Sequence, residues 1–373
     1  MTNTKELPTY IRLTIIALGI LIWGYILVVG QLVIVPILYA TLFAILLNPM
    51  VGFLSAKGIK PLFAITITMV IALGLLAGLC YLLVSQFQVL SDTFPHFQEK
   101  FFLLSHSTID WLALRLNLSA GQINGWLANL RTQAMANSGI YLTQTVSTLG
   151  VFVAGLVIIP VYIFMLLYYQ PLLMDFIRQL FSKVHHAPVV DIMKQVRAAV
   201  QSYLRGLMIE SVIVATLNVI ALLLIGVDYA VLLGIIGGVL NIIPYLGGMA
   251  AVGLPMIVAL VNQDVFHMLL VLGAYSLIQF IDNNYLLPKV VASKVQVNAL
   301  ISVVGVIIAG ALWGIAGMFL SIPLLAVIKI VCDHIEELKP WGFLLGDTMP
   351  KPTVVDTFLH TPKQRTKAHK HTA

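Results

Sequence analysis

The feature that most constrains this chain is a set of long runs without any charged residue. Residues 13–56 contain no Asp, Glu, Lys or Arg over 44 positions, and residues 61–91 contain none over 31 positions. About 20 mainly apolar residues are enough to cross a bilayer as a helix. The first run therefore has the length of two spanning helices, with Gly30 and Gln31 as the turn between them, and the second run predicts a third.

Composition excludes a soluble globular enzyme. Hydrophobic residues make up 60% of the 373 positions and charged residues only 10%, whereas an average soluble domain carries roughly 25% charged residues. The two cysteines, Cys80 and Cys332, indicate neither a disulfide framework nor a zinc site. We expect no metal, no cofactor and no nucleic-acid partner, and we place a fourth span within residues 132–174.

The C-terminal half contains two apolar runs that are each interrupted near the middle. Residues 229–263 and 295–328 hold no charge over 35 and 34 positions, and the interruptions are Asn241–Gly248 and Gly310–Gly317. The pieces on either side are short for full spans, so they predict broken helices or re-entrant hairpins with protected backbone groups. Paired interruptions at corresponding positions are typical of the substrate site of a transporter.

The distribution of basic residues predicts the orientation. With the N-terminus in the cytoplasm, the outer segments hold Lys100, Arg115 and Arg131, and the other 18 of the 21 basic residues face inward. This asymmetry obeys the positive-inside rule. We therefore expect an all-α polytopic membrane protein with about six full transmembrane helices plus two broken or re-entrant helical hairpins, eight hydrophobic segments in all, and cytoplasmic N- and C-termini.

Two amphipathic segments, residues 92–131 and Pro171–Arg205, complete the predicted organisation. The second is expected to form two short helices broken at His185–Pro188, ahead of a spanning helix from Gly206 to Gly226. The expected domains are a four-helix membrane scaffold over 1–170 with an external amphipathic hairpin at 92–131, a cytoplasmic amphipathic linker over 171–205, a transport unit over 206–330 with the two interrupted hairpins, and a cytoplasmic C-terminal segment over 331–373 with a basic flexible tail.

Acidic residues within apolar segments are the clearest candidates for function, because a charge is costly to bury there. Glu210 is either a proton or cation site or an interfacial carboxylate paired with Arg205 or Lys194. Asp282 continues a polar helix face with Tyr275 and Gln279, which is either a substrate or ion path or a polar seam between helices. The sequence contains no catalytic motif and no nucleotide-binding loop, so we do not expect an enzyme.

We predict that residues at the two interruptions and around Asp282 line a substrate path. Its members are Asn241, Pro244, Tyr245, Gly247, Gly248, Gln279, Asp282, Asn283, Gly310, Trp313, Gly314 and Gly317. The candidates for ion coupling are Asp282, Glu210 and Arg205.

At these positions the chain resembles the autoinducer-2 exporter family of bacterial inner-membrane proteins. The resemblance extends to about Gly346 and rests on an ordered set of stretches: Pro160–Met165, Tyr203–Gly206, Leu240–Gly247, Gln279–Asn284 with Pro288, Trp313–Met318 and Ile322–Pro323. The chain departs from the family pattern at Gly248, where Pro is frequent, at Asn298-Ala299, where His-Pro is common, and at Ala292, where Gly is frequent.

The resemblance implies a multi-pass secondary transporter of the bacterial inner membrane that assembles as a homo-oligomer. Family members have been linked to export of a quorum-sensing signal and to exchange of sodium or lithium for protons. Our main hypothesis is ion- or proton-coupled export of a small polar organic molecule, such as an autoinducer-2-like signal or a related metabolite. The alternatives are a sodium or lithium/proton antiporter and a non-transporting membrane scaffold. The expected partners are the lipid bilayer, a small polar solute and H⁺ or Na⁺.

Overall fold

The computed structural model describes residues 8–85, 155, 157–181, 186–244, 247–291 and 297–347, and these residues are helical apart from short connections. Among these residues, six helical stretches are by length and composition apolar enough to cross a membrane: Tyr10–Val29, Gln31–Ala56, Pro61–Ser85, Pro188–Ile225, Val265–Val290 and Ala299–His334, of which the last is broken at Trp313 and Gly314. The expected all-α polytopic membrane fold is thereby confirmed. The predicted external hairpin at 92–131, Tyr245 and the basic tail lie outside the described residues.

The N-terminal half presents apolar side chains outward. Helix α1 (Thr9–Val29) exposes nearly all of its large apolar residues, and a single residue, Gly30, separates it from α2 (Gln31–Ala56). An exposed apolar surface of this kind suits lipid rather than water. The inner side of α2 packs on two helices, Pro61–Ser85 and Val157–Tyr168, through a cluster that includes Ala44, Ile65 and Leu167.

The chain bends after Tyr168, within the region expected to hold the end of the fourth span. Helix Val157–Tyr168 and α6 (Gln170–Gln179) meet at an angle of 64°. Pro171 stands in the first turn of α6, where a proline is tolerated because its missing N–H would have no partner. Apolar residues lie on one face of α6 and Asp175, Arg178 and Gln179 on the other, as the sequence indicates for this amphipathic segment.

Helix α7 is a continuous element of 40 residues, His186–Ile225. The expected division between a short amphipathic helix and a separate spanning helix at Gly206 is therefore wrong. Gly206 is buried within α7, and tertiary packing offsets the roughly 1 kcal/mol by which glycine disfavours a helix interior. The expected break between two helices near His185–Pro188 is confirmed, because α6 ends at Gln179 and α7 begins at His186. Pro188 lies in the first turn of α7, a position that accepts proline.

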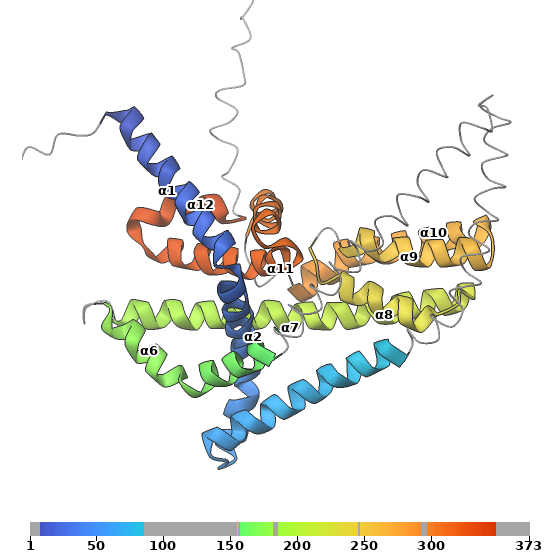
Figure 1. Ribbon diagram of the computed structural model, residues 1–373, viewed down its shortest axis with the longest axis horizontal. Helices are drawn as coiled ribbons and strands as arrows, with labels where there is room; N and C mark the ends of the chain where they lie inside the picture. Colours follow the sequence, from blue (N-terminus) through green and yellow to red (C-terminus); the bar gives the residue numbers. More distant parts are fainter. Residues whose placement is uncertain are drawn as a thin grey trace, which may run out of the picture.

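Figure 1 shows α7 crossing the whole molecule, with α1, α2 and α6 toward one end. Along the other end lie α8 (Ala230–Leu240), α9 (Gly247–Asn262) and α10 (Val265–Ile281). An apolar cluster joins Leu42 of α2, Leu204 of α7 and Leu320 of α11 (Ala299–His334). A second cluster joins α7 to the helices that follow it, through Leu222, Leu233 and Val271. Because α7 contributes to both clusters, it connects the two halves of the fold.

The first interrupted run forms a helical hairpin of α8 (Ala230–Leu240) and α9 (Gly247–Asn262). At 1.5 Å per residue these helices measure about 17 and 24 Å, less than the roughly 30 Å of a bilayer core. The hairpin is closed at its base, where Asn262 Nδ2 donates to Asp228 Oδ2 over 2.9 Å. At its tip Gly247 packs against the carbonyl oxygen of Leu240, where a larger residue would collide.

Helix α8 lies against α7 through two glycines four residues apart. A Cβ on Gly238 would lie 2.7 Å from Ala215 Cα, and one on Gly234 would lie 2.8 Å from Val219 Cα. This spacing is the small-residue pattern by which membrane helices bring their backbones together. Ser211 of α7 adds a hydrogen bond of 2.8 Å to the carbonyl oxygen of Gly238.

The second interrupted run, α11 (Ala299–His334), also folds back on itself. Its helical geometry fails at Trp313 (φ −135°) and Gly314 (φ 60°, ψ −143°). Across this turn, a Cβ on Gly310 would lie 2.7 Å from Met318 Cε, and Gly305 faces Leu325. Both predicted interruptions are thus breaks in the helices. The 36 residues of α11 form two antiparallel segments.

The chain between the two hairpins forms α10 (Val265–Ile281) and η2 (Asp282–Val291), a π-helix that contains Pro288. A π-helix adds residues to a helical turn and often occurs at functional sites. Beyond α11, the short helices η4 (Glu336–Leu338) and α12 (Lys339–Leu345) return to the start of α11.

Candidate functional site: a buried carboxyl pair

Two acidic side chains are withdrawn from solvent in the part of the chain that the structure describes. Glu210 on α7 and Asp282 at the junction of α10 and η2 are each 2% exposed. A buried acid needs a charge partner, hydrogen-bond donors or a proton of its own. The surroundings of these two side chains therefore decide what they can do.

The two acids meet each other. Their side chains lie close enough to interact, and a hydrogen bond between two carboxyl groups would require that one of them carries a proton. Without that proton, Glu210 Oε2 and Asp282 Oδ1 are buried and have no hydrogen-bond partner among the described residues. Two adjacent carboxylates repel each other strongly, so the pair is suited to hold one proton or one small cation.

Neutral amides complete the surroundings of Asp282. Asn241 Nδ2, at the C-terminal end of α8, donates to Asp282 Oδ2 over 3.0 Å. Gln279 Nε2 lies 3.4 Å from the same oxygen and 3.4 Å from Asn283 Oδ1. Gly248 packs against the Gln279 amide, and a Cβ there would collide with Gln279 Oε1. The tip of the α8–α9 hairpin is thereby held against the acid pair.

The alternative pairing of Glu210 with a basic residue does not occur among the described residues. Arg205 is exposed, and its Nη2 donates to Gln201 Oε1 over 2.9 Å. Gln201 in turn donates to the carbonyl oxygen of Ile45 over 2.7 Å. No described ion pair joins Glu210 to Arg205 or Lys194. Arg205, which was predicted as a candidate for ion coupling together with Glu210 and Asp282, thus forms no ion pair with either acid among the described residues.

The predicted path residues fall into two groups. The structure brings Asn241, Gly248, Gln279 and Asn283 together around Asp282, and Pro244 and Gly247 lie at the same hairpin tip. The second group is Gly310, Trp313, Gly314 and Gly317, at the turn of α11.

The turn of α11 packs on the N-terminal helices instead of the acid pair. Trp313 Nε1 donates to the carbonyl oxygen of Leu27 over 2.9 Å, and Tyr39 OH donates to the carbonyl oxygen of Ala316 over 3.1 Å. The two hairpin tips nevertheless border a common apolar cluster, because Ile242 and Trp313 both pack against it. The second interruption therefore links the C-terminal half to α1 and α2.

Two buried polar residues near the acids were not among the predicted path residues. Asn218 and Tyr275 are 2% and 6% exposed, and their Asn218 Oδ1 and Tyr275 OH atoms have no hydrogen-bond partner among the described residues. Tyr275 was recognised only as part of the polar face of α10. For Asn218 the available signal was its spacing of eight residues from Glu210, which places both on one face of a helix.

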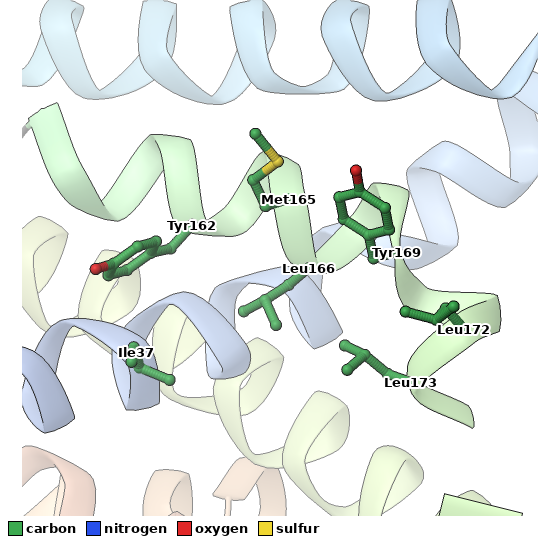
Figure 2. A pocket seen from close by; sticks show the side chains of 7 residues that line it. All are labelled: Ile37, Tyr162, Met165, Leu166, Tyr169, Leu172 and Leu173. Atoms are coloured by element: carbon green, nitrogen blue, oxygen red, sulfur yellow. The ribbon is translucent and has the colours of Figure 1, made fainter. Parts of the chain in front are cut away.

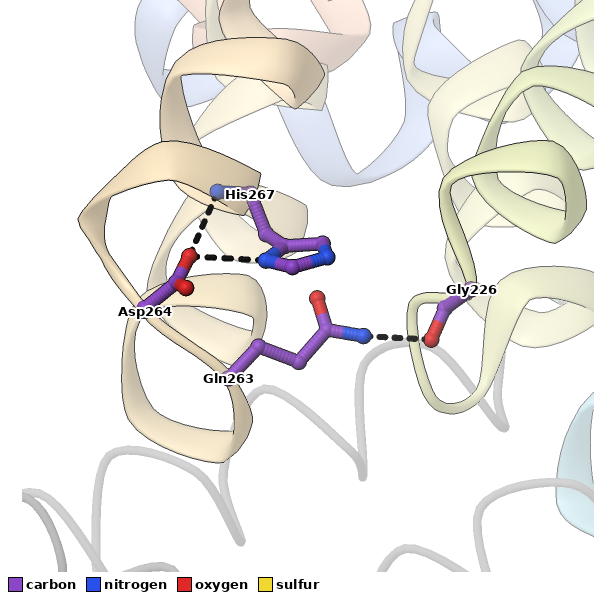
Figure 3. A network of polar contacts seen from close by, with 4 residues as sticks. All are labelled: Gly226, Gln263, Asp264 and His267. Carbon is purple, nitrogen blue, oxygen red and sulfur yellow. Dashed lines mark hydrogen bonds and ion pairs between the residues drawn. The ribbon is translucent and has the colours of Figure 1, made fainter.

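The base of the first hairpin has its own polar network, shown in Figure 3. Asp264 Oδ1 caps α10 by accepting the backbone N–H of His267 over 2.8 Å, and His267 Nδ1 lies 2.7 Å from the same oxygen. These two hydrogen bonds, the backbone one above all, hold the pKa of Asp264 below its ordinary value. Gln263 Nε2 donates to the carbonyl oxygen of Gly226 over 2.5 Å.

An apolar groove of about 470 Å³ lies elsewhere, between α2 and the bent pair of helices before α7. Figure 2 shows its lining of aliphatic and tyrosine side chains. The lining residues are Ile37, Tyr162, Met165, Leu166, Tyr169, Leu172 and Leu173. None of them is acidic or basic, so the groove is chemically distinct from the carboxyl pair.

Comparison with known proteins identifies relatives along most of the chain. YrrI, a candidate transport protein of Bacillus subtilis (strain 168), is 25% identical over 86% of this chain and 91% of its own length. YhhT, a candidate transport protein of Escherichia coli (strain K12), is 26% identical over 86% of this chain and 89% of its own length. The AI-2 transport protein TqsA of the same strain is 25% identical over 84% of this chain and 90% of its own length.

A family model covers the same region and includes both hairpins and the carboxyl pair. Residues 12–337 match the model described as AI-2E family transporter, which begins within α1 and ends beyond α11. The chain is therefore a multi-pass membrane protein of a transporter family, and it belongs to the AI-2E transporter family.

Proposed function

We propose that this protein is a secondary transporter of the bacterial inner membrane that exports a small polar organic molecule and couples export to the movement of a proton or another small cation. The observation that carries the proposal is the contact between Glu210 and Asp282, beside the interrupted hairpin α8–α9. A single structural role would be served more cheaply by apolar side chains, because buried ionisable groups in membranes are costly.

The carboxyl pair supplies the coupling chemistry. Two carboxylates placed close together repel each other, and binding of one proton or one monovalent cation changes the net charge of the pair by one. When the shared proton leaves, the carboxylates repel each other, and one of them must gain a cation or move away. Asn241 transmits such a movement to the tip of α8–α9, because its amide is hydrogen-bonded to Asp282.

The hairpin tips supply the route for the solute in this proposal. The break after Leu240 frees backbone groups from helical hydrogen bonding, and such groups in membrane proteins face protein or a water-filled cavity. Broken helices therefore recognise polar solutes without a buried full charge. We extend the proposed transport unit from residue 206 back to the start of α7, because this helix is continuous from His186 to Ile225.

The substrate we propose is an autoinducer-2-like signal or a related metabolite, which would give the protein a role in quorum sensing. The relative TqsA is named for AI-2 transport, and it covers most of the present chain. We also propose assembly as a homo-oligomer in which exposed apolar helices such as α1 meet a neighbouring copy. The proposed transport direction is outward.

The experiment compares the external metabolites of bacteria that lack related transporters and express wild-type protein, Asp282→Asn or Glu210→Gln. We expect a polar compound to accumulate in the medium with wild-type protein and to fall at least tenfold with Asp282→Asn. Asp175→Asn, an exposed acid on α6 with a surface ion partner, is the matched control. Wild-type accumulation in both acid variants at equal membrane content would overturn the proposal.

A second candidate function is exchange of sodium or lithium for protons, and the facing carboxyl groups specifically favour it. Two acidic side chains supply hard oxygen ligands of the kind that small cations prefer. In proteoliposomes loaded with a pH-sensitive dye, a pulse of NaCl or LiCl should then move protons, and Glu210→Gln should abolish the signal. Choline chloride is the control pulse, and absence of any cation response from pH 6 to 9 removes this candidate.

A further inference from the structure

The break in α11 contacts the N-terminal helices, away from the carboxyl pair. Trp313 stands at this break, where the backbone leaves helical geometry, and its indole Nε1 donates over 2.9 Å to the carbonyl oxygen of Leu27 in α1. The two residues are 286 positions apart. The proposed coupling between the carboxyl pair and the α8–α9 hairpin does not involve this hydrogen bond, so the bond needs a separate explanation.

The carbonyl group of Leu27 lies in the last turn of α1, where the helix itself offers it no donor. Helix α1 ends at Val29, and the last four carbonyl groups of a helix lack a partner four residues further on. Within a bilayer no water replaces that partner, so an unsatisfied carbonyl group is costly. The indole of Trp313 therefore caps the end of α1 from a distant part of the chain.

Helix α1 has few other contacts that set its direction. Of the helices labelled in Figure 1, only α2 and α11 lie against α1. Its large apolar side chains are exposed, with Leu21 at 70% and Tyr25 at 71%. A single residue, Gly30, separates α1 from α2. The angle between α1 and α2 therefore depends mainly on the conformation of Gly30 and on the hydrogen bond from Trp313.

The conformation of Gly30 is close to that of an uninterrupted helix. Its φ is −79° and its ψ is 2°, compared with about −63° and −42° in an α-helix. A rotation of roughly 40° in ψ would bring the N–H of Gln31 toward the carbonyl oxygen of Leu27, which is its acceptor in a continuous helix. The carbonyl group of Leu27 thus has two alternative donors, Trp313 and Gln31.

Helix α2 holds the break in α11 by contacts of its own. Tyr39 OH donates to the carbonyl oxygen of Ala316 over 3.1 Å, and the Tyr39 ring stacks on Phe319 with 5.3 Å between the ring centroids. These contacts do not involve α1, so they can persist when the bond from Trp313 to Leu27 opens. The indole can therefore withdraw from α1 while α11 stays against α2.

We propose that the indole of Trp313 is a removable cap that holds α1 at one angle to α2. When the break in α11 moves and the indole withdraws, Leu27 accepts the N–H of Gln31, Gly30 becomes helical and α1 changes direction. A hydrogen bond is suited to this role because it weakens steeply as its angle changes. The direction of α1 thus follows the conformation of the break in α11. The inference goes beyond the proposed function, since it requires neither a solute nor a coupling ion.

The test measures the distance between spin labels at Leu13 on α1 and Val212 on α7 by pulsed electron paramagnetic resonance. Both side chains are exposed, and the free cysteines, Cys80 and Cys332, are first replaced by Ser and Ala.

Trp313→Phe keeps an aromatic ring at the break and removes the donor to Leu27. A turn of about 20° at Gly30, acting over the 17 residues back to Leu13, displaces the label on α1 by about 9 Å at 1.5 Å per residue. We therefore expect Trp313→Phe to shift the mean label distance by several ångströms. Trp341→Phe, which removes an exposed indole of α12, is the matched control and should keep the wild-type distance.

Gly30→Ala is a second, independent variant. Alanine favours a helical conformation, and a Cβ on Gly30 would lie 2.9 Å from the carbonyl oxygen of Ile26 in the described conformation. The variant should therefore shift the label distance in the same direction as Trp313→Phe.

The proposal requires the same shift in both variants and none in Trp341→Phe. A shift in one folded variant alone, shifts in opposite directions, or wild-type distances in both would overturn it. If melting in detergent shows that Trp313→Phe is misfolded, Gly30→Ala decides. None of these measurements depends on transport, so they remain decisive even where the proposed function fails.

Discussion

The amide of Asn241 donates to the carboxyl of Asp282 across 3.0 Å, although the two residues are 41 positions apart. The contact joins a break between two short helices to the residue at which α10 becomes a π-helix. A conformational change at either element therefore reaches the other. Substitution of Asn241 is therefore the most direct way to remove the contact between the hairpin tip and the carboxyl pair.

Replacing Asn241 by Leu should weaken both the fold and transport. The change removes the donor to Asp282 and leaves a buried acceptor with fewer partners, which costs about 1–3 kcal/mol. We expect a lower melting temperature in detergent and loss of the transport signal of the wild-type protein. Asn262→Leu, which removes an amide bond to the exposed base of the same hairpin, should retain transport. Wild-type melting and transport for Asn241→Leu would contradict the coupling through this contact.

Gly314→Ala should destabilise the second hairpin. Gly314 has φ 60° and ψ −143°, a conformation that costs a residue with a Cβ about 1–3 kcal/mol. Thermal unfolding in detergent, followed by helical circular dichroism, measures the change. Gly253→Ala in α9 is the control, because a Cβ there meets no atom within 4 Å and alanine favours a helix. We expect the control to be neutral or stabilising, and equal melting of the two variants would count against the strained turn.

Asn298→Ala should lower the melting temperature by weakening the attachment of α12 to the start of α11. Asn298 Oδ1 caps α11 by accepting the N–H of Ile301 over 3.0 Å, and its Nδ2 donates to the carbonyl oxygen of Leu344 over 3.0 Å. Loss of the cap costs about 0.5–2 kcal/mol. Asn298→Asp keeps the cap and loses the donation to Leu344, so it should fall between wild type and Asn298→Ala in melting temperature. Any other order would contradict these two roles.

Asp264 should stabilise the base of the first hairpin in a pH-dependent way. Its pKa is lowered in the folded protein, so folding is favoured by its ionised form. The stabilisation is fully present above the unfolded pKa of about 3.9 and is lost as the pH falls through the lower folded value. The melting temperatures of wild type and Asp264→Ala should therefore differ at pH 6 and converge in strong acid. A difference that persists unchanged at pH 2 would show that the charge is not responsible.

The interruptions of the two C-terminal runs could be predicted because their cause is local. Glycine and proline weaken a helix wherever they occur, and the clusters at Asn241–Gly248 and Gly310–Gly317 mark the two breaks. The same reasoning failed for Gly206, which lies inside α7. A single glycine can be retained in a helix when packing around it is favourable, and packing cannot be read from neighbours in sequence.

The members of the carboxyl pair could also be predicted one by one, because each stands in an apolar segment. Their contact could not, since Glu210 and Asp282 are separated by 72 positions and meet through the packing of α7 against η2. Similarly, nothing in the sequence around Trp313 indicates that its indole donates to Leu27 near the other end of the chain. Sequence patterns identify which side chains are unusual, and the tertiary fold determines which of them meet.

Because α7 is long, a tilt of this helix at the carboxyl pair would displace residues far from the pair. Forty residues at 1.5 Å each form a rod of about 60 Å, twice the thickness of a bilayer core. Near its first turns, Gln195 Nε2 lies 3.1 Å from His334 Nε2 of α11. A tilt of about 10° at Glu210 would swing that distant end by several ångströms, as for any lever of this length. In the proposed mechanism, a tilt of α7 driven by binding at the carboxyl pair would therefore also move the junction of α7 with the end of α11.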